Sequence, residues 1–197
     1  GSHIQYLHRP VGFYQRLSES IDLIQTEYVA LAGDDEFYIP TAVESCITEL
    51  NEDDGLVACC GRAMSFAPKN QRVIGGVQYP NLKDYALDSD SAKERLVQHM
   101  RNYALSLFYA ICSTTHWKIA LKYTLQNEFP FFAASELQFH MCMAYAGRSK
   151  VIPELMWLRS LGETEPVRGT DASLDHKKSF PDWWADSSKV DEHEKFV

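Results

Sequence analysis

The sequence lacks several features that would assign a chain to a class at once. Its longest apolar runs are far shorter than the roughly 18–20 residues that span a bilayer, and no signal peptide is visible. Its five cysteines show no C-x-x-C zinc spacing. Its 19 basic residues are outnumbered by 27 acidic ones, so a clustered basic surface for nucleic acid is missing. These absences argue against a transmembrane protein, a zinc module and a general nucleic-acid binder.

The cysteines and the composition also indicate the setting and size of the fold. An odd number of cysteines, with Cys59 and Cys60 adjacent in an apolar run, is typical of reduced, buried thiols, so we expect a cytoplasmic protein. With 197 residues, 45% of them hydrophobic, the chain can bury one substantial core. We predict one α/β domain over residues 4–160. Residues 161–197, which are polar and broken, are predicted to form a C-terminal loop and a peripheral helix around Trp183.

A short apolar run that ends in three acids is the most informative segment. Residues 27–33 read EYVALAG, and Asp34, Asp35 and Glu36 follow directly. The run predicts a buried strand, and open α/β sheets bind their ligands at the carboxyl ends of strands. Adjacent carboxylates repel one another unless water, backbone donors or a cation offset the repulsion. The segment therefore predicts either a metal–diphosphate site or a solvated acidic turn.

The surrounding patterns predict alternating helices and strands. Apolar residues at three- and four-residue spacing indicate helices over 12–25 and from Pro40 to about residue 52. Residues 56–66 and 71–79 read as a β-hairpin, and 88–100 as a helix capped by Asp90 or Ser91. Residues 105–111 are predicted to be a buried strand, 115–125 a helix and 151–159 a late strand.

A second acid, Glu136, occupies a helix that we predict within the segment from Phe131 to Gly147. Ser135 is predicted to be its N-cap, and Gly147 lies where the helix should stop. Glu136 would then lie in the first turn, where the helix macrodipole favours a carboxylate even without a catalytic role. His140 lies one turn later, and we assign it no role because no third metal ligand is near in sequence.

The order of these segments resembles the middle of a family 2 glycosyltransferase, which has the GT-A nucleotide-diphospho-sugar fold. That family carries a glycine followed a few residues later by an Arg-Asn pair, a helix, and a strand that leads to a D-x-D-D cluster; Gly12, Arg16 and Asp34-Asp35 fill those places here. The Asn is replaced by Leu17, and the first Asp of D-x-D falls on Ala32. The resemblance implies a GT-A-like mixed sheet flanked by helices, in which the N-terminal nucleotide-binding strands are missing. Sheet edges exposed by such a truncation would favour pairing with another copy.

The resemblance also implies an activity and roles for particular residues. The domain would transfer a sugar from a nucleotide-diphosphate donor to a carbohydrate or other hydroxyl acceptor. Asp34 and Asp35, with Glu36 as a substitute ligand, would hold Mg²⁺ or Mn²⁺. Glu136 would be the catalytic base, and Arg16 and Arg159 would help to bind the donor.

The residues leave alternatives open. Arg16 is equally readable as a surface arginine that pairs with Glu19 or Ser20. Trp117 and Trp157 suit either a sugar site or a core. The first rival function is a non-catalytic GT-A-like module that binds a carbohydrate or a protein. The second is a metal-dependent nucleotidyl- or phosphoryl-transfer enzyme that uses the same acids.

Overall fold

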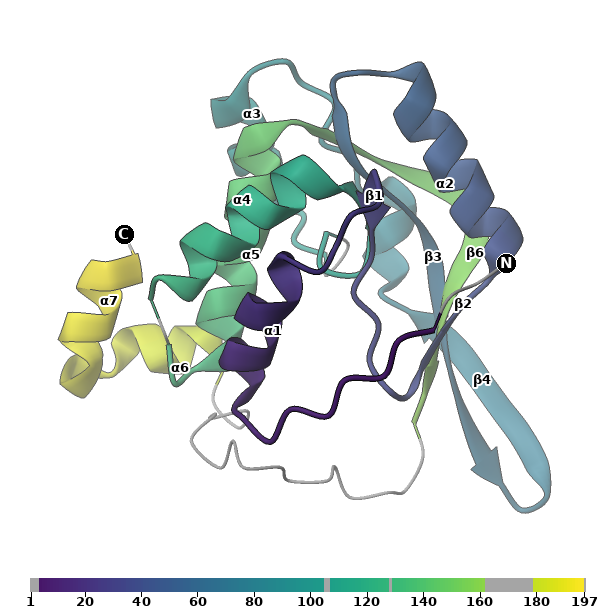
Figure 1. Cartoon of the computed structure of the whole chain (residues 1–197), viewed down its shortest axis with the longest axis horizontal. Helices are drawn as coiled ribbons and strands as arrows, with labels where there is room; N and C mark the ends of the chain where they lie inside the picture. The colour runs from purple at the N-terminus through teal and green to yellow at the C-terminus, as the bar shows by residue number, and fades with distance from the viewer. Residues whose placement is uncertain (1–3, 105–106, 128, 162–178, 197) are drawn as a thin grey trace.

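The computed structural model describes residues 4–104, 107–127, 129–161 and 179–196. It is a mixed α/β structure in which helices lie on both sides of a curled sheet (Figure 1). The elements are, in chain order, α1 (Phe13–Ile21), β1 (Tyr28–Val29), β2 (Glu36–Tyr38), α2 (Pro40–Glu52), β3 (Leu56–Lys69), β4 (Arg72–Gln78), the 3-10 helix η1 (Pro80–Asp84), α3 (Ala92–Arg101), β5 (Ile111–Ser113), α4 (Thr114–Leu125), α5 (Phe132–Ala146), β6 (Arg148–Ser160), α6 (Phe180–Ala185), the 3-10 helix η2 (Ser187–Lys189) and α7 (Val190–Phe196).

The long strands β3 and β6 form the parallel centre of the sheet. The strand order is β1-β5-β3-β6-β2, and β4 pairs with the outer part of β3. All other pairings within the described residues are antiparallel. Gly61 is needed in β3 because a Cβ there would lie 2.6 Å from the Glu154 carbonyl oxygen of β6.

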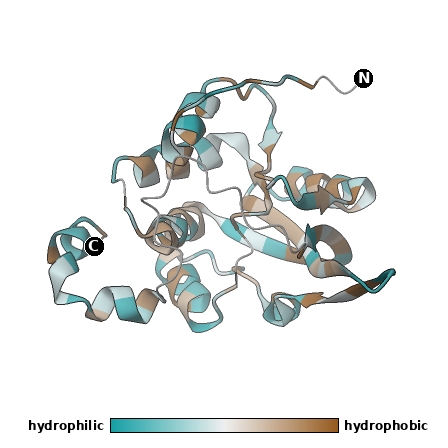
Figure 2. Cartoon of the chain, turned by 90° about the horizontal axis from the view of Figure 1, so that it is seen from below, coloured by the Kyte–Doolittle hydropathy of each residue, from teal (hydrophilic) through white to brown (hydrophobic). Residues whose placement is uncertain are grey.

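Helices cover the two faces of this sheet unequally. On one face α2 packs against β3 and β6, and the Cys46 thiol lies 3.5 Å from the Met156 sulfur. On the other face α5 contacts β3 and packs against α3 and α4, and α4 also contacts β5 and β1. Most of α5 is apolar around its whole circumference, which is expected of a helix enclosed on several sides. The β3–β4 hairpin extends beyond this body, and Figure 2 shows hydrophobic residues beside its hydrophilic turn.

Several sequence predictions are confirmed. The Pro40 helix, the β-hairpin, the 115–125 helix and the late strand all form, with end shifts of a few residues. Ser91 caps α3 by accepting the backbone N–H of Glu94. The predicted C-terminal segment contains α6, where Trp183 is buried against Phe129 and Phe131, and the loop predicted before it falls largely on residues 162–178, which lie outside the described residues.

Two predicted strands are wrong in extent. The buried strand expected over residues 27–31 is reduced to Tyr28–Val29, which is half-buried because β1 is an edge strand that pairs only with β5 among the described strands. Of the strand expected over 105–111, only Ile111 belongs to β5, the described residues 107–110 form turns and a bend, and residues 105–106 lie outside the described ranges. Leu107 and Phe108 are buried without belonging to a strand: the Phe108 ring contacts Phe139 of α5, and Leu107 lies beside Ala58 and Cys60 of β3.

The structure also describes the cysteines and shows whether any helix could span a membrane. Cys46, Cys59, Cys60 and Cys112 are buried free thiols, and Cys142 is a partly buried one. Across the described ranges, no helix combines the length and the apolar character that a bilayer crossing requires.

Candidate functional site

The register between β2 and β6 gathers charged side chains at one edge of the sheet. Glu36 lies directly opposite Arg159, so both side chains point to the same face. Asp35, in the turn before β2, places its carboxylate 3.7 Å from the Arg159 Nε. The backbone N–H of Ser160 donates to the Asp35 carbonyl oxygen at 2.8 Å, which fixes the turn against the end of β6. Arg159 therefore faces both acids.

The two carboxylates converge over Gly33. The Gly33 N–H donates to the Glu36 carboxylate at 2.6 Å. A Cβ at Gly33 would lie 3.0 Å from Asp35 Oδ1 and 3.3 Å from Glu36 Oε2. Burial raises the pKa of Glu36, the Gly33 N–H and Arg159 oppose that rise, and the neighbouring acids Asp35 and Asp34 reinforce it. A cation at this position would relieve the repulsion among the acids.

The predicted metal ligands fit a divalent cation in part. No group of three or more His, Cys, Asp or Glu side chains among the described residues has the arrangement of a metal site. Mg²⁺ commonly takes only one or two carboxylates from the protein and completes its octahedron with phosphate oxygens and water. Asp35 and Glu36 supply such a pair, whereas Asp34 is exposed in the turn. Metal binding by Asp34, Asp35 and Glu36 stays a prediction.

Glu136 approaches the same region from α5, but not from its first turn. The N-cap is Phe131, so the prediction that Ser135 caps the helix is wrong. The helix begins one turn earlier because Phe132 packs against Phe13 of α1, at 5.5 Å between ring centroids. Ser135 is buried, and its hydroxyl lies 2.8 Å from the Tyr14 hydroxyl. The first turn contains no acid, so the macrodipole does not account for Glu136.

The environment of Glu136 changes its acidity. Burial raises the pKa of its carboxyl to about 7, and the positive charge of Arg159 opposes this rise. Arg159 thus interacts electrostatically with Glu136 as well as with Asp35 and Glu36. A carboxyl with a pKa near neutrality can accept and release a proton at physiological pH.

An aromatic stack adjoins the charged groups. The Trp157 ring, on the same face of β6 as Arg159, stacks with Tyr109 at 4.1 Å and with Tyr79 at 5.6 Å between ring centroids. Trp157 is buried, and its indole N–H has no hydrogen-bond partner among the described residues. Burial, followed by the charges of Glu36 and Glu136, raises the pKa of the Tyr109 phenol. The stack therefore lies beside the carboxylates and Arg159.

Tyr79 has an unusual backbone conformation. Its φ is 51°, in the left-handed region that residues other than glycine rarely occupy. A backbone conformation of this kind destabilises the fold by about 1–3 kcal/mol, and it persists only where the surrounding structure holds it, often at functional sites. Here the surroundings include the Trp157 stack and η1, which begins at Pro80.

The structure thus unites some of the predicted site residues and separates others. Asp35, Glu36 and Arg159 meet at the sheet edge, and Glu136 is close enough for the charge of Arg159 to affect its pKa; we call these four residues with Tyr79, Tyr109 and Trp157 the charged–aromatic cluster. Arg16 lies exposed on α1, which belongs to none of the segments that form the cluster.

Sequence reasoning missed Tyr79 and Tyr109. Tyr109 lay in the run mistaken for a strand, and Tyr79 closed the predicted hairpin just before Pro80. For Tyr79 the sequence did contain a signal, because a bulky residue there stands between a predicted strand and a proline, where the chain is expected to turn.

Two further residues that the sequence singled out belong to the core. His140 is fully buried with its ring 5.3 Å from that of His99, and burial lowers its pKa. Trp117 is buried in α4, where its ring meets that of Phe139 at 6.4 Å. Neither residue joins the charged–aromatic cluster.

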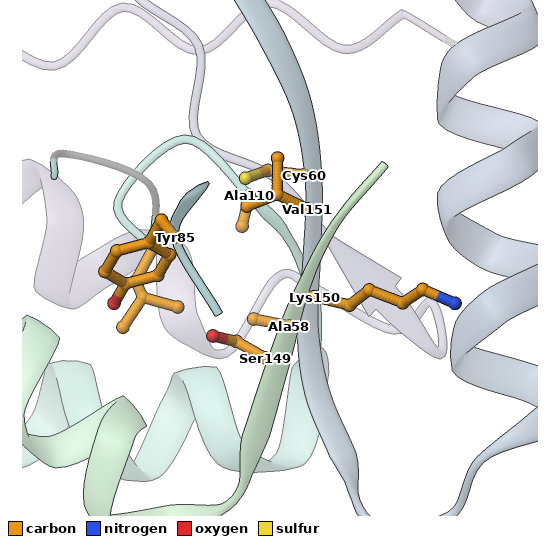
Figure 3. Close-up of a pocket in the computed structure, with 8 residues that line it drawn as sticks. Ala58, Cys60, Tyr85, Ala110, Ser149, Lys150 and Val151 are labelled. Atoms are coloured by element: carbon orange, nitrogen blue, oxygen red, sulfur yellow. The ribbon is translucent and has the colours of Figure 1, made fainter. Parts of the chain in front are cut away.

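Two hollows in the structure are not part of this cluster. The space between β3, β6 and Tyr85 is too small to hold a water molecule, since the volume open to one is about 0 Å³. Figure 3 shows Lys150 pointing to the other side of the strand from Tyr85 and Ser149. A groove of about 560 Å³ lies among α3, α4, α5 and α7. It is lined by apolar and weakly polar side chains that include Ile119, Met141 and Tyr145.

Comparison with known proteins assigns no family: no protein-family model matches the chain, and no curated protein matches its sequence. The fold and the site therefore define the protein only as a mixed α/β protein that brings carboxylates, an arginine and stacked aromatic rings together at one sheet edge.

Proposed function

We propose that the protein is a glycosyltransferase domain of the GT-A-like class, resembling family 2. It would transfer a sugar from a nucleotide-diphosphate donor to an acceptor hydroxyl. One observation carries the proposal: Glu136, with its pKa near 7, shares Arg159 with the acidic turn of Asp35 and Glu36. Glycosyl transfer needs a base for the acceptor and a cationic environment for the leaving diphosphate, and this cluster supplies both kinds of group.

Glu136 is the base in this proposal. Its carboxylate takes the proton of the acceptor hydroxyl as that oxygen forms its bond to the anomeric carbon. The bond from the anomeric carbon to the diphosphate oxygen breaks in the same displacement, so the configuration at that carbon inverts. A base with a pKa of about 7 is partly ionised at physiological pH and is still strong enough to accept the proton.

Arg159 and the acidic turn act on the donor. The Arg159 guanidinium presents several donors to phosphate oxygens and carries a permanent positive charge. Asp35 and Glu36 would hold Mg²⁺ or Mn²⁺, which when bound neutralises charge on the departing nucleoside diphosphate. Burial first, and then the neighbouring Asp35 and Asp34, raise the pKa of Glu36, and a bound cation would offset this rise by favouring the ionised form.

The aromatic stack supports a carbohydrate substrate. Sugar rings present C–H faces that pack on aromatic side chains, and their hydroxyls pair with nearby charged groups. Tyr79 and Tyr109 combine both features beside Glu136 and Arg159.

Calorimetric titration with UDP and GDP, with and without Mn²⁺, tests the proposal. The variant Asp35→Asn removes one carboxylate of the acidic turn, and Asp84→Asn is the matched control because Asp84 is an exposed acid paired with Lys83 on η1. We expect Mn²⁺-dependent binding that Asp35→Asn abolishes and Asp84→Asn leaves intact. Hydrolysis of a UDP- or GDP-sugar by the wild type, lost in Glu136→Gln, would then establish turnover.

The other outcomes select the rival functions. Binding of a carbohydrate without hydrolysis of any nucleotide sugar would indicate the non-catalytic module, which the replacement of the first D-x-D acid by Ala32 favours. Turnover of nucleoside triphosphates or phosphate esters, with none of nucleotide sugars, would indicate a nucleotidyl- or phosphoryl-transfer enzyme. Either result would refute the proposal.

A further inference from the structure

The outer edge of β4 is exposed, and its one charged residue is Arg72 at the start of the strand. Within the described residues β4 pairs only with β3, so its other edge presents backbone N–H and C=O groups without a strand partner. Natural edge strands are usually protected by charged side chains, proline or bulges. Between Arg72 and Gln78 this strand reads VIGGV and carries none of these protections. Figure 2 shows the projecting ribbon with its hydrophobic stretch next to the hydrophilic turn.

The side chains of this edge are also apolar and unburied. Val73 is 72% exposed, Ile74 54% and Val77 69%. The body of the protein carries its main core elsewhere, so burial of these residues against the rest of the chain does not account for them. β-Branched residues favour a paired, half-buried strand, and here the pairing exists on one side only.

Val73 and Val77 continue an apolar row across the sheet. Three neighbouring pairs in the sheet form this row: Phe37 of β2 lies opposite Leu158 of β6, Leu158 opposite Met64 of β3, and Met64 opposite Val77 of β4. Residues that lie opposite one another in a sheet point to the same face, so all four side chains share one face. Phe37 is 56% exposed, and its ring contacts Phe66 at 6.1 Å. The helix α2 begins only at Pro40 and covers the part of this face that contains Met156. The apolar row thus ends at the open edge of β4.

The sequence of β4 is nearly symmetric about Gly75. In an antiparallel pair with a two-fold axis normal to the sheet, the residue on the axis lies opposite its own copy. With Gly75 on the axis, Val73 lies opposite Val77 of the other copy, and Arg72 lies opposite Gln78. This register makes two Val–Val cross-strand pairs and places no like charges opposite one another, as a favourable antiparallel pair requires. Registers centred on Ile74 or Gly76 place each valine opposite a glycine or outside the strand.

We propose that β4 is a homodimerisation edge, at which two copies of this chain pair antiparallel about Gly75 and join their sheets. The partner is a second copy because the edge complements itself in both side chains and charge. Such an isologous interface repeats each contact twice. It buries the exposed valines and satisfies the open backbone groups of both edges.

Sedimentation equilibrium over a concentration series tests the interface. We expect a reversible monomer–dimer equilibrium in the wild type. Val73→Lys and Val77→Lys should raise the dimer Kd by roughly tenfold or more, because an edge lysine opposes strand pairing. Ile119→Lys is the matched control, since Ile119 is 64% exposed in the other apolar surface, the groove on α4, and the control should leave the Kd unchanged.

Cysteine cross-linking tests the register. In a Cys142→Ser background, Gly75→Cys places the two introduced thiols opposite each other, where the Cα atoms of an antiparallel pair lie about 4.5–5.5 Å apart, within the range that a disulfide bridges. Gly76→Cys moves the thiols apart along the strands to more than about 7 Å between Cα atoms, too far for a bridge. Neither substitution should disturb the fold, because a Cβ at Gly75 meets nothing closer than 3.4 Å and one at Gly76 meets nothing within 4 Å. With an added oxidant, we expect a covalent dimer from Gly75→Cys and not from Gly76→Cys.

Three outcomes would overturn the proposal. One is a wild type that stays monomeric at every concentration. Another is a dimer that Ile119→Lys dissociates and the β4 lysines do not, which would place the interface at the groove. The third is cross-linking by Gly76→Cys in preference to Gly75→Cys, which would exclude the register about Gly75.

Discussion

Replacing Glu136 with glutamine should stabilise the protein, and by an amount that depends on pH. Burial in the cluster raises the pKa of Glu136 from 4.5 to about 7, so the fold favours its neutral form. Glutamine has the same shape as the protonated side chain and cannot ionise. The variant should therefore keep the packing and remove the cost of ionising a buried carboxyl.

The sign and size follow from the two pKa values. Below about pH 4.5 the carboxyl is neutral in both the folded and the unfolded chain, so Glu136→Gln leaves the free energy of unfolding nearly unchanged. Between pH 4.5 and 7 the unfolded chain ionises and the folded one resists, so the wild type loses stability relative to the variant. At about 1.36 kcal/mol for each pH unit between the two pKa values, the difference approaches about 3 kcal/mol above pH 7 as an upper limit.

Urea unfolding of both proteins at pH 4, 5.5, 7 and 8.5 measures this difference. Other titrating groups affect both proteins alike, so their contributions largely cancel in the comparison. Glu44→Gln, on the exposed side of α2, is the matched control that makes the same substitution away from the cluster. A stability difference that stays constant with pH, or a variant less stable than the wild type at pH 8.5, would refute the assignment of a buried, hard-to-ionise Glu136.

Three further predictions concern Arg159 and Trp157 of the cluster and the neighbouring Gly33. Arg159→Gln removes the charge that lowers the pKa of Glu136, so the acidic limb of the transferase pH profile should move to higher pH; an unchanged limb would separate Arg159 from Glu136. Trp157→Ala should lower the free energy of unfolding by about 3–5 kcal/mol in urea denaturation, because Trp157 is 3% exposed and stacks on two tyrosines. Gly33→Ala should weaken Mn²⁺ binding in calorimetry, since the new Cβ would lie 3.0 Å from the Asp35 carboxylate, while the free energy of unfolding changes by less than about 1 kcal/mol. Tight Mn²⁺ binding by Gly33→Ala would argue against metal binding over Gly33.

The helices and the hairpin could be predicted because their signals are local. The three- and four-residue apolar spacing after Pro40, the Ser91 cap and the turn after Ala67-Pro68 each act within a few residues. The prediction failed where burial came from distant packing. Leu107 and Phe108 are apolar and buried, as in a strand, yet they lie in turns, where Phe108 packs against α5 and Leu107 lies beside β3. An apolar run records that a segment is buried, not which element buries it.

The acidic turn shows the same limit at the candidate site. The sequence indicates that Asp34, Asp35 and Glu36 are adjacent, but it does not determine which carboxylates face Arg159. That choice depends on the register of β2 against β6, which fixes Glu36 opposite Arg159 and leaves Asp34 exposed.

By itself, therefore, the sequence determined the residue types of the site and most of the elements that carry them, since composition, caps and periodicity are properties of neighbouring residues. Only the tertiary structure decided which of those residues meet. Glu136 and the Asp35–Glu36 turn are about 100 residues apart in the chain, and they share Arg159 because α5 packs on the face of the sheet to which β6 directs that side chain. The same packing removes water from Glu136 and so raises its pKa, a property that depends on the fold around the residue and not on its neighbours in sequence.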